Sequence, residues 1–288
     1  MRSRVHSLVL AFVLLPFACT PAWAWGCRGH EIIALIAAAH LQPAVAARVR
    51  QILEVPVGPA PLHPCRGAAH LPSMARFAGW ADAVRTPATE AFHFVDLPLD
   101  DRRNQARYAS ICQSQCLSAA LNRYMRQLHA GSTTARDRAI ALRYVIHLVG
   151  DAFQPLHVSD HGDRGGNCVR TRLPGARRRS ELHADWDSGI LNRMMGTGDV
   201  EEYAEHLDRH FGGRYASGSL HPLDWIWSSH AVAVRTAYGP LHLAPGCHER
   251  TIRLSRSYVR TAEAAIRRQL DRAGSRLAAV LNQELSRP

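Results

Sequence analysis

Apolar residues recur at intervals of three and four along most of this chain, the spacing that places them on one face of a helix. The pattern predicts helices over residues 31–41, 44–54, 117–129, 135–152, 181–195, 223–238 and 257–285. Strand-like alternation of apolar and polar residues is almost confined to residues 92–97. Glycine and proline interrupt the helical pattern, and the longest turn-rich stretch covers residues 162–174. We therefore expect an all-α fold.

Residues 1–24 have the pattern of a secretory signal peptide. Arg2 and Arg4 precede a short apolar run, and the small-x-small sequence AWA ends at Ala24. Neither this run nor any later stretch approaches the roughly 20 apolar residues that a membrane-spanning helix needs. We expect cleavage after Ala24, a mature chain that begins at Trp25, and a secreted or periplasmic location.

The cysteines support export to an oxidising compartment. Cys19 leaves with the signal; it is also a candidate lipoprotein site, which the neighbouring Pro16 and Phe17 disfavour. The mature chain keeps six cysteines, at positions 27, 65, 112, 116, 168 and 247. Their even number predicts up to three disulfides, whose pairing the sequence does not choose. Without a linker or repeat, residues 25–288 are expected to form one domain.

The charge adds a weak indication of the partner. The formal net charge is +11 at pH 7, and every basic residue other than histidine is an arginine. A positive field attracts polyanions such as nucleic acid or anionic lipid, but a genome rich in G and C also favours arginine. The run Arg177-Arg178-Arg179 could contact phosphate or form a solvated loop.

Histidine and aspartate recur at a spacing that suits a metal ion. His147 and Asp151 stand four residues apart on a predicted helix, so their side chains share one face. His183 and Asp187 repeat the spacing, and His157 lies between the two pairs. One such pair is usually a solvated salt bridge, whereas two pairs and a further histidine favour a shared site.

Two further polar residues stand among apolar ones, Asp82 in the sequence WADAV and His93 in FHFV. Each alone is more often a hydrogen-bonded core group. Imidazole and carboxylate ligands without thiolate suit Zn²⁺, with coordination positions left open for water or substrate.

In this order along the chain, the residues resemble the zinc-dependent single-strand nucleases of the S1/P1 type. The matching motifs are Trp25-Gly26 followed by His30, Trp80-Ala81-Asp82, His93 with Asp96, His147 with Asp151 and His157, Asp163-x-Gly165-Gly166-Asn167, and His183 with Asp187. The resemblance covers almost the whole mature chain. It implies a single, mainly helical domain with three zinc ions in a cleft.

The resemblance also implies how the ligands are shared. One zinc ion would be held by Asp82, His93, His147 and Asp151, a second by His157, His183 and Asp187, and a third by His30, Asp151 and the backbone amine and carbonyl of Trp25. Signal cleavage would expose that amine. Asp151 would bridge two ions.

The implied reaction is in-line attack of water on a phosphodiester, which leaves a 5′-phosphate and a 3′-hydroxyl. Asp96 would orient the water, Phe94 would stack on a base, and Asn167 is a further candidate substrate contact. Asp96 could instead cap the turn before Pro98, and Phe94 could be a core residue.

Three functions compete: a nuclease with 3′-nucleotidase activity, a zinc-dependent phospholipase C, and a zinc-stabilised binding protein. The phospholipases have a longer gap between the N-terminal tryptophan and the first histidine, and glutamate in the last ligand pair. The short gap from Trp25 to His30 and the presence of Asp187 favour the nuclease. We expect a monomer that acts on single-stranded DNA, RNA and 3′-nucleotides, with no stable protein partner.

Overall fold

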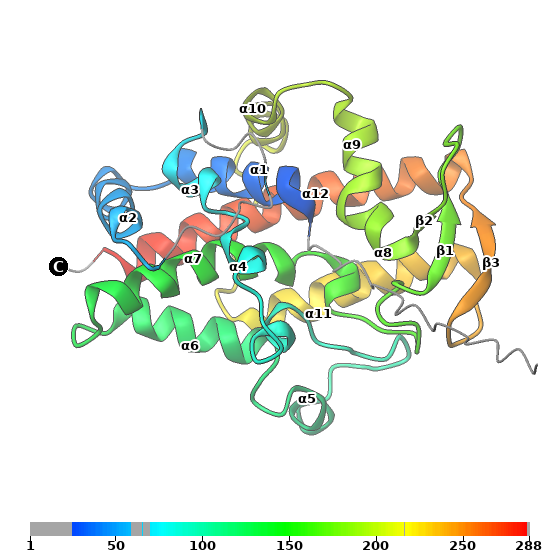
Figure 1. The fold of residues 1–288 in the computed structure, drawn as a ribbon, viewed down its shortest axis with the longest axis horizontal. Helices are drawn as coiled ribbons and strands as arrows, with labels where there is room; N and C mark the ends of the chain where they lie inside the picture. The colour runs from blue at the N-terminus through cyan, green and yellow to red at the C-terminus, as the bar shows by residue number, and fades with distance from the viewer. Residues whose placement is uncertain (1–24, 59–64, 66–69, 216, 287–288) are drawn as a thin grey trace, which may run out of the picture.

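The computed structural model describes residues 25–58, 65, 70–215 and 217–286. The predicted signal peptide lies outside these residues. In the described part of the chain, the α-helices are α1 Gly26–Ala39, α2 Pro43–Glu54, α3 Ser73–Arg76, α4 Trp80–Ala83, α5 Gln105–Cys112, α6 Leu117–His129, α7 Ala135–Ala152, α8 Leu182–Ala184, α9 Ile190–Met195, α10 Val200–Phe211, α11 Pro222–Val232 and α12 Arg256–Glu284. The helical prediction is confirmed (Figure 1).

Helix α7 occupies the centre of the domain. Thr134 caps its N-terminus by accepting a 3.1 Å hydrogen bond from the backbone amide of Asp137. The helix ends just before Pro155, which cannot continue a helix. It packs against α1, α2, α6 and α12, and its second half is buried almost without interruption. A polar side chain in that half is therefore held away from bulk water.

The observed helices follow the apolar pattern closely, with two differences. Both α6 and α7 have the predicted bounds. The segments predicted as long helices near residues 181–195 and 223–238 instead contain the π-helical stretches Asp185–Gly189 and Ala233–Tyr238. Helices α5 and α10 and the four-residue helices α3 and α4 were not predicted.

The strand-like alternation of residues 92–97 does not produce a strand. A 3₁₀ helix covers Glu90–His93, and the extended residues after it pair with a loop rather than a strand. Val95 donates its amide hydrogen to the carbonyl oxygen of His157 at 2.9 Å, and Asp160 donates to that of Leu97 at 2.9 Å. These bonds fasten the segment that carries Phe94 and Asp96 beside the chain that follows α7.

Of the three strands that the described residues form, only the first lies in the predicted turn-rich stretch 162–174. β1 Val169–Arg172, β2 Ser180–Glu181 and β3 His248–Arg253 form one sheet in the order β2-β1-β3. β1 is antiparallel to β2 and parallel to β3. These strands have too few residues for a clear alternating pattern. Figure 1 shows the sheet at one end of the domain, beyond α8.

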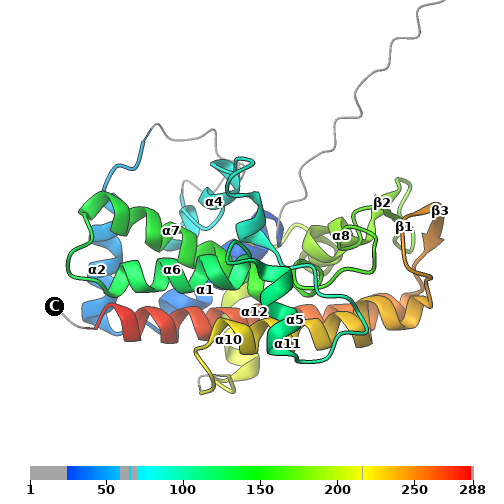
Figure 2. The same ribbon diagram turned by 90° about the horizontal axis from the view of Figure 1, so that it is seen from below.

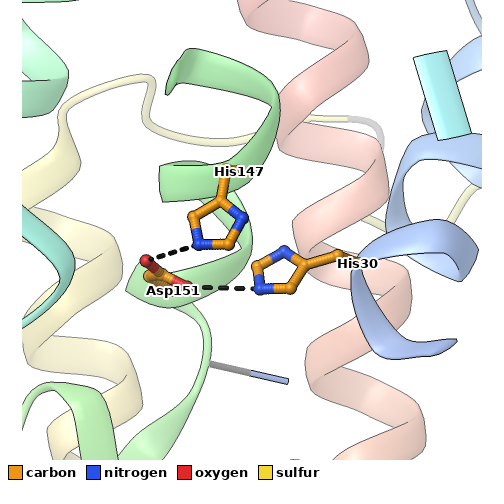
Figure 3. A group of neighbouring side chains, drawn as sticks. All are labelled: His30, His147 and Asp151. Carbon is orange, nitrogen blue, oxygen red and sulfur yellow. Dashed lines mark ion pairs between the residues drawn. The ribbon is translucent and has the colours of Figure 1, made fainter. Parts of the chain in front are cut away.

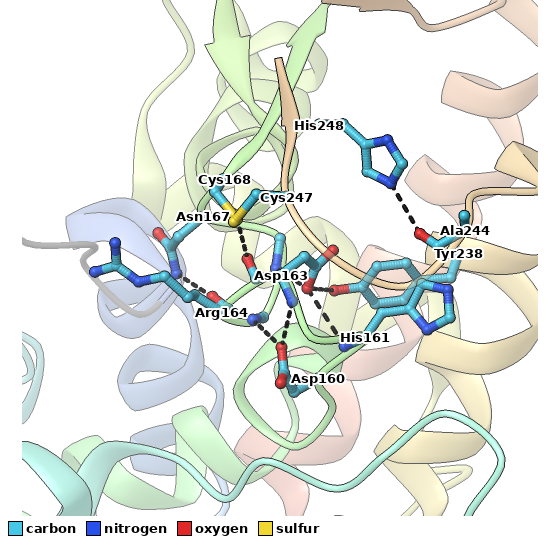
Figure 4. The surroundings of a disulfide bond; sticks show 12 residues. Asp160, His161, Asp163, Arg164, Asn167, Cys168, Tyr238, Ala244, Cys247 and His248 are labelled. Carbon is cyan, nitrogen blue, oxygen red and sulfur yellow. Dashed lines mark hydrogen bonds between the residues drawn. A yellow bond between two sulfur atoms is a disulfide. The ribbon is translucent and has the colours of Figure 1, made fainter. Parts of the chain in front are cut away.

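Three disulfides form, as many as the sequence allowed. They join Cys27 to Cys65, Cys112 to Cys116, and Cys168 to Cys247. The last one connects the start of β1 to the start of β3 (Figure 4). Among the described residues, no helix is both long and apolar enough to cross a membrane.

Candidate metal centre

The paired residues of α7 lie at the middle of a buried group of imidazoles and carboxylates. His147 and Asp151 have no exposed surface, and His147 Nε2 lies 3.4 Å from Asp151 Oδ2. Figure 3 shows His30 reaching the same carboxylate from α1; its Nε2 lies 3.4 Å from Asp151 Oδ1. The i, i+4 spacing therefore produces the shared face that the sequence predicted.

Every histidine and aspartate predicted as a metal ligand enters one of three buried or nearly buried groups. The groups are His30, His147 and Asp151; Asp82, His93 and His147; and His157, His183 and Asp187. Within each group the ligand atoms lie within 4.8 Å of one another. Each group could hold a metal ion.

Asp151 joins these groups. Its Oδ2 accepts a 3.1 Å hydrogen bond from His93 Nδ1, and its Oδ1 lies 4.0 Å from His157 Nδ1. Burial alone would raise the pKa of Asp151, but the surrounding imidazoles, His147 foremost, lower it well below its ordinary value. Asp151 is thus held as a carboxylate between His30 and His157.

The ligand atoms around Asp187 lie equally close to one another. His183 Nε2 lies 3.2 Å from Asp187 Oδ2 and 3.2 Å from His157 Nε2. Burial lowers the pKa of His157 to about 4. A neutral His157 can offer a lone pair to a cation at neutral pH.

Backbone carbonyls orient three of the imidazoles. The Nδ1 atoms of His147, His157 and His183 lie 2.8, 2.8 and 2.7 Å from the carbonyl oxygens of Ala78, His93 and Gly165, respectively. A carbonyl only accepts, so each Nδ1 carries hydrogen, and in the neutral form of each ring Nε2 keeps its lone pair. Metal-binding histidines are commonly held in this way.

Several buried polar atoms of the centre have no hydrogen-bond partner. They are Nδ1 and Nε2 of His30, Oδ1 of Asp82, Nε2 of His93, Nε2 of His147 and Oδ1 of Asp151. Unsatisfied buried polar atoms are rare and cost about 1–3 kcal/mol each. Their concentration here, and a donor set of imidazole and carboxylate, fit Zn²⁺.

Glycine and tryptophan bring α1 close to α7. The His30 ring stacks on His147 with 3.9 Å between centroids, and a Cβ atom at Gly150 would lie only 2.7 Å from His30 Nδ1. Trp25 is fully buried, and its indole nitrogen donates a 2.9 Å hydrogen bond to the carbonyl of Gly150. Gly26 begins α1 with φ of +46°, a conformation that favours glycine. The Trp-Gly pair thus anchors the start of α1 beside the residue that precedes Asp151.

The predicted substrate contacts lie less deeply. Phe94 is half-buried and is not part of the hydrophobic core. Asp96 has an exposed surface, yet partial loss of water around its carboxylate, and then the nearby Asp160, raise its pKa to about 6. Asn167 is also half-buried, but its amide donates a 2.8 Å hydrogen bond to the carbonyl of Arg164 (Figure 4).

The sequence reasoning missed Gln154. This fully buried side chain donates a short hydrogen bond to Asp187 and accepts one of 2.5 Å from the amide of Leu156. It fixes a predicted ligand to the turn that carries His157. Its place between Asp151 and Pro155 was the only available signal.

The turn-rich stretch supports the same group. Asp160 Oδ1 accepts hydrogen bonds from the amides of Asp163 and Gly165, at 3.1 and 2.9 Å. Asp163 Oδ1 accepts from the amide of Gly166 and the hydroxyl of Tyr238, each at 2.9 Å (Figure 4). These bonds hold the carbonyl of Gly165 against His183.

Comparison with known proteins finds a family whose match includes all the residues of the His–Asp centre. The family model described as S1/P1 Nuclease matches residues 25–286. Nuclease P1 of Penicillium citrinum is 27% identical over 212 residues, 70% of this chain and 72% of that protein. Nuclease PA3 of a Penicillium species is 28% identical over 192 residues, 64% of this chain and 65% of that protein. Endonuclease 5 of Arabidopsis thaliana is 22% identical over 306 residues, 96% of each chain.

Proposed function

Because this chain belongs to the S1/P1 nuclease family, we propose that its His–Asp centre hydrolyses phosphodiester bonds in single-stranded DNA and RNA to leave 5′-phosphates. The related nucleases support a hydrolytic, single-strand-specific endonuclease and do not favour phospholipase C. The observation that carries the proposal is the meeting of three His/Asp groups around Asp151.

The family is zinc-dependent, and the donor set described above fits that metal. We assign three ions per chain, to Asp82, His93, His147 and Asp151; to His157, His183 and Asp187; and to Trp25, His30 and Asp151. Bound there, zinc would lower the pKa of water and offset negative charge on the phosphate.

The third assignment depends on the start of the mature chain. We propose that cleavage after Ala24 frees the α-amino group of Trp25, because an amide nitrogen has no available lone pair. The buried indole of Trp25 would hold that amine near Asp151. The same cleavage would accompany export to the periplasm or the medium.

The remaining residues would position the reactants. Water attacks phosphorus, the bond between phosphorus and the 3′ oxygen breaks, and that oxygen takes up a proton. Above a pH of about 6, Asp96 is a carboxylate that can accept a hydrogen bond from the attacking water. Phe94 would stack on a base, and Asn167 would contact the sugar or phosphate.

Preference for single strands follows from stacking. A base must leave its duplex stack before it can lie on an aromatic side chain such as Phe94. A 3′-nucleotide has a phosphate on the same 3′ oxygen, so the same centre would act on it. We propose that one chain suffices, since the ligands all come from one domain.

The direct test incubates zinc-loaded protein that begins at Trp25 with single-stranded DNA, RNA, duplex DNA and phosphatidylcholine in parallel. We expect cleavage of both single strands to 5′-phosphate products, slower cleavage of the duplex, and intact lipid. Equal rates on single strands and duplex would reject the strand preference. Lipid hydrolysis without nuclease activity would overturn the function.

A further inference from the structure

Five arginines of the small sheet and of the loop between β1 and β2 have no role in the His–Asp centre. We propose that Arg172, Arg177, Arg178, Arg179 and Arg253, here called the arginine rim, bind the phosphate backbone of a single strand beyond the cleavage site. This inference rests on the proposed nuclease function. It extends the site to long substrates.

Buried and more exposed residues alternate along β1. Val169 and Thr171 are fully buried, and Thr171 donates a 2.6 Å hydrogen bond to Asp185 in the helical segment that carries Asp187. Arg172, the next residue, therefore belongs to the opposite face of the strand. One face of β1 supports the metal centre, and the other presents positive charge.

Two arginines of the rim are paired across the sheet. Arg172 stands directly opposite Arg253 across the parallel pair β1 and β3. Like charges in this position destabilise a sheet. The Nε atom of Arg172 is also buried without a hydrogen-bond partner. An anion between the two guanidinium groups would relieve both features.

Acidic residues that could neutralise the rim are few in the segments that carry it. Residues 169–181 and 248–253 contain seven arginines and only two glutamates. Within the described part of the chain, none of the five rim arginines forms an ion pair. All three residues of the run Arg177-Arg178-Arg179 are exposed, so their charge is available to a partner.

Most of the arginine rim lies close to the His–Asp centre along the chain. Arg179 precedes His183 by four residues, at most about 13 Å along an extended chain. Figure 2 shows β1 and β2 beside α8, on the same side of α12 as α4, which carries Asp82. Arg193 of α9 donates a 2.9 Å hydrogen bond to the carbonyl of Pro174 and so holds the turn that leads to the run. A strand leaving the centre can reach this surface within a few nucleotides.

The test compares a long and a short substrate. The variant R177Q/R178Q/R179Q is assayed on a 30-nucleotide single strand and on a dinucleotide over a range of salt concentrations. We expect kcat/KM on the long strand to fall about 10-fold or more at low salt, with the dinucleotide unchanged. The slope of log kcat/KM against log salt should decrease by about 2, at 0.7 per lost phosphate contact.

The matched control R50Q/R126Q/R268Q removes the same charge from exposed positions on α2, α6 and α12. Equal effects of both variants would overturn the inference, because net charge alone would then explain the loss. Loss of binding to anionic phosphatidylglycerol vesicles, with long-strand kinetics retained, would overturn it in favour of a lipid surface. Wild-type protein that cleaves neither substrate would instead reject the proposed function.

Discussion

Two polar groups are buried at the C-terminal end of α7, and they differ in whether their hydrogen bonds are complete. The His–Asp centre leaves six buried atoms without a partner. The second group, the Gln269 network, joins α12 to α11 and the end of α7. Gln269 donates hydrogen bonds of 2.8 and 3.0 Å to the Phe153 carbonyl and the Ser229 hydroxyl.

The Gln269 network is closed. Ser229 donates a 2.7 Å hydrogen bond to the carbonyl of Ala152, and the amide oxygen of Gln269 accepts one of 3.0 Å from Arg272. A satisfied buried network stabilises one packing of the helices. A concentration of buried lone pairs without donors is instead arranged for a cation. Completeness of hydrogen bonding therefore distinguishes the Gln269 network from the His–Asp centre.

The largest expected effect is a loss of activity, and it comes from a substitution in the His–Asp centre. Asp151→Asn keeps the shape of the side chain but removes the charge shared by two proposed ligand sets. Altering residues that merely support a metal ligand typically costs 10–100-fold, so we expect a loss of at least ~100-fold in kcat/KM. Asp187→Asn, which affects one set, should lose less. Equal losses would contradict a bridging role for Asp151.

A substitution in the Gln269 network should lower stability without affecting catalysis. Gln269→Leu removes the hydrogen-bond donor to the carbonyl of Phe153 and the acceptor of Arg272 Nη1, so the free energy of unfolding should fall by about 1–3 kcal/mol. Urea denaturation measures this change. Zinc content and kcat/KM at 25 °C should remain those of the wild type. A loss of bound zinc would show that the two groups are coupled.

The smallest effect concerns Asp271, a buried carboxyl whose Oδ2 has no partner. Burial and the nearby Asp208 raise its pKa to about 7, against the smaller opposing effect of His40. The folded chain therefore binds this proton more tightly than the unfolded chain. Its contribution to stability is full below about pH 4 and is lost as pH rises through 7.

The check is thermal unfolding of metal-free wild type and Asp271→Asn between pH 4 and 8. The variant should lack one decrease in Tm that the wild type shows as pH rises toward 7. Parallel pH curves for the two proteins would contradict this role of Asp271. Such curves would show that Asp271 does not bind a proton more tightly in the folded chain than in the unfolded chain.

Local sequence patterns predicted those features of the fold and the site that depend on a single helix. The apolar periodicity predicted α6 and α7 with their bounds, and the four-residue spacing predicted that His147 and Asp151 share a face. The resemblance to a family selected Asp82 and His93, which come from a four-residue helix and a 3₁₀ turn. Such short elements are held by tertiary contacts and have too few residues for a period.

Features that depend on distant partners were beyond the sequence. β1 and β2 consist of four and two residues, and the pairing of β1 with β3 is supported by the disulfide between Cys168 and Cys247. The sequence allowed that disulfide without selecting it. Gln154 was missed because an amide next to proline has many ordinary roles. Only its contact with Asp187 reveals its support of a ligand.

The central claim is that the open group is a zinc centre completed by the amine of Trp25. The most direct measurement is the zinc content of purified protein that begins at Trp25, beside the same chain with one glycine added before it. We predict three zinc ions per chain in the first protein and loss of the ion shared by His30 and Asp151 in the second, with the helical circular dichroism unchanged. Equal zinc content in both, or one ion or none in the first even after zinc is added, would contradict the account.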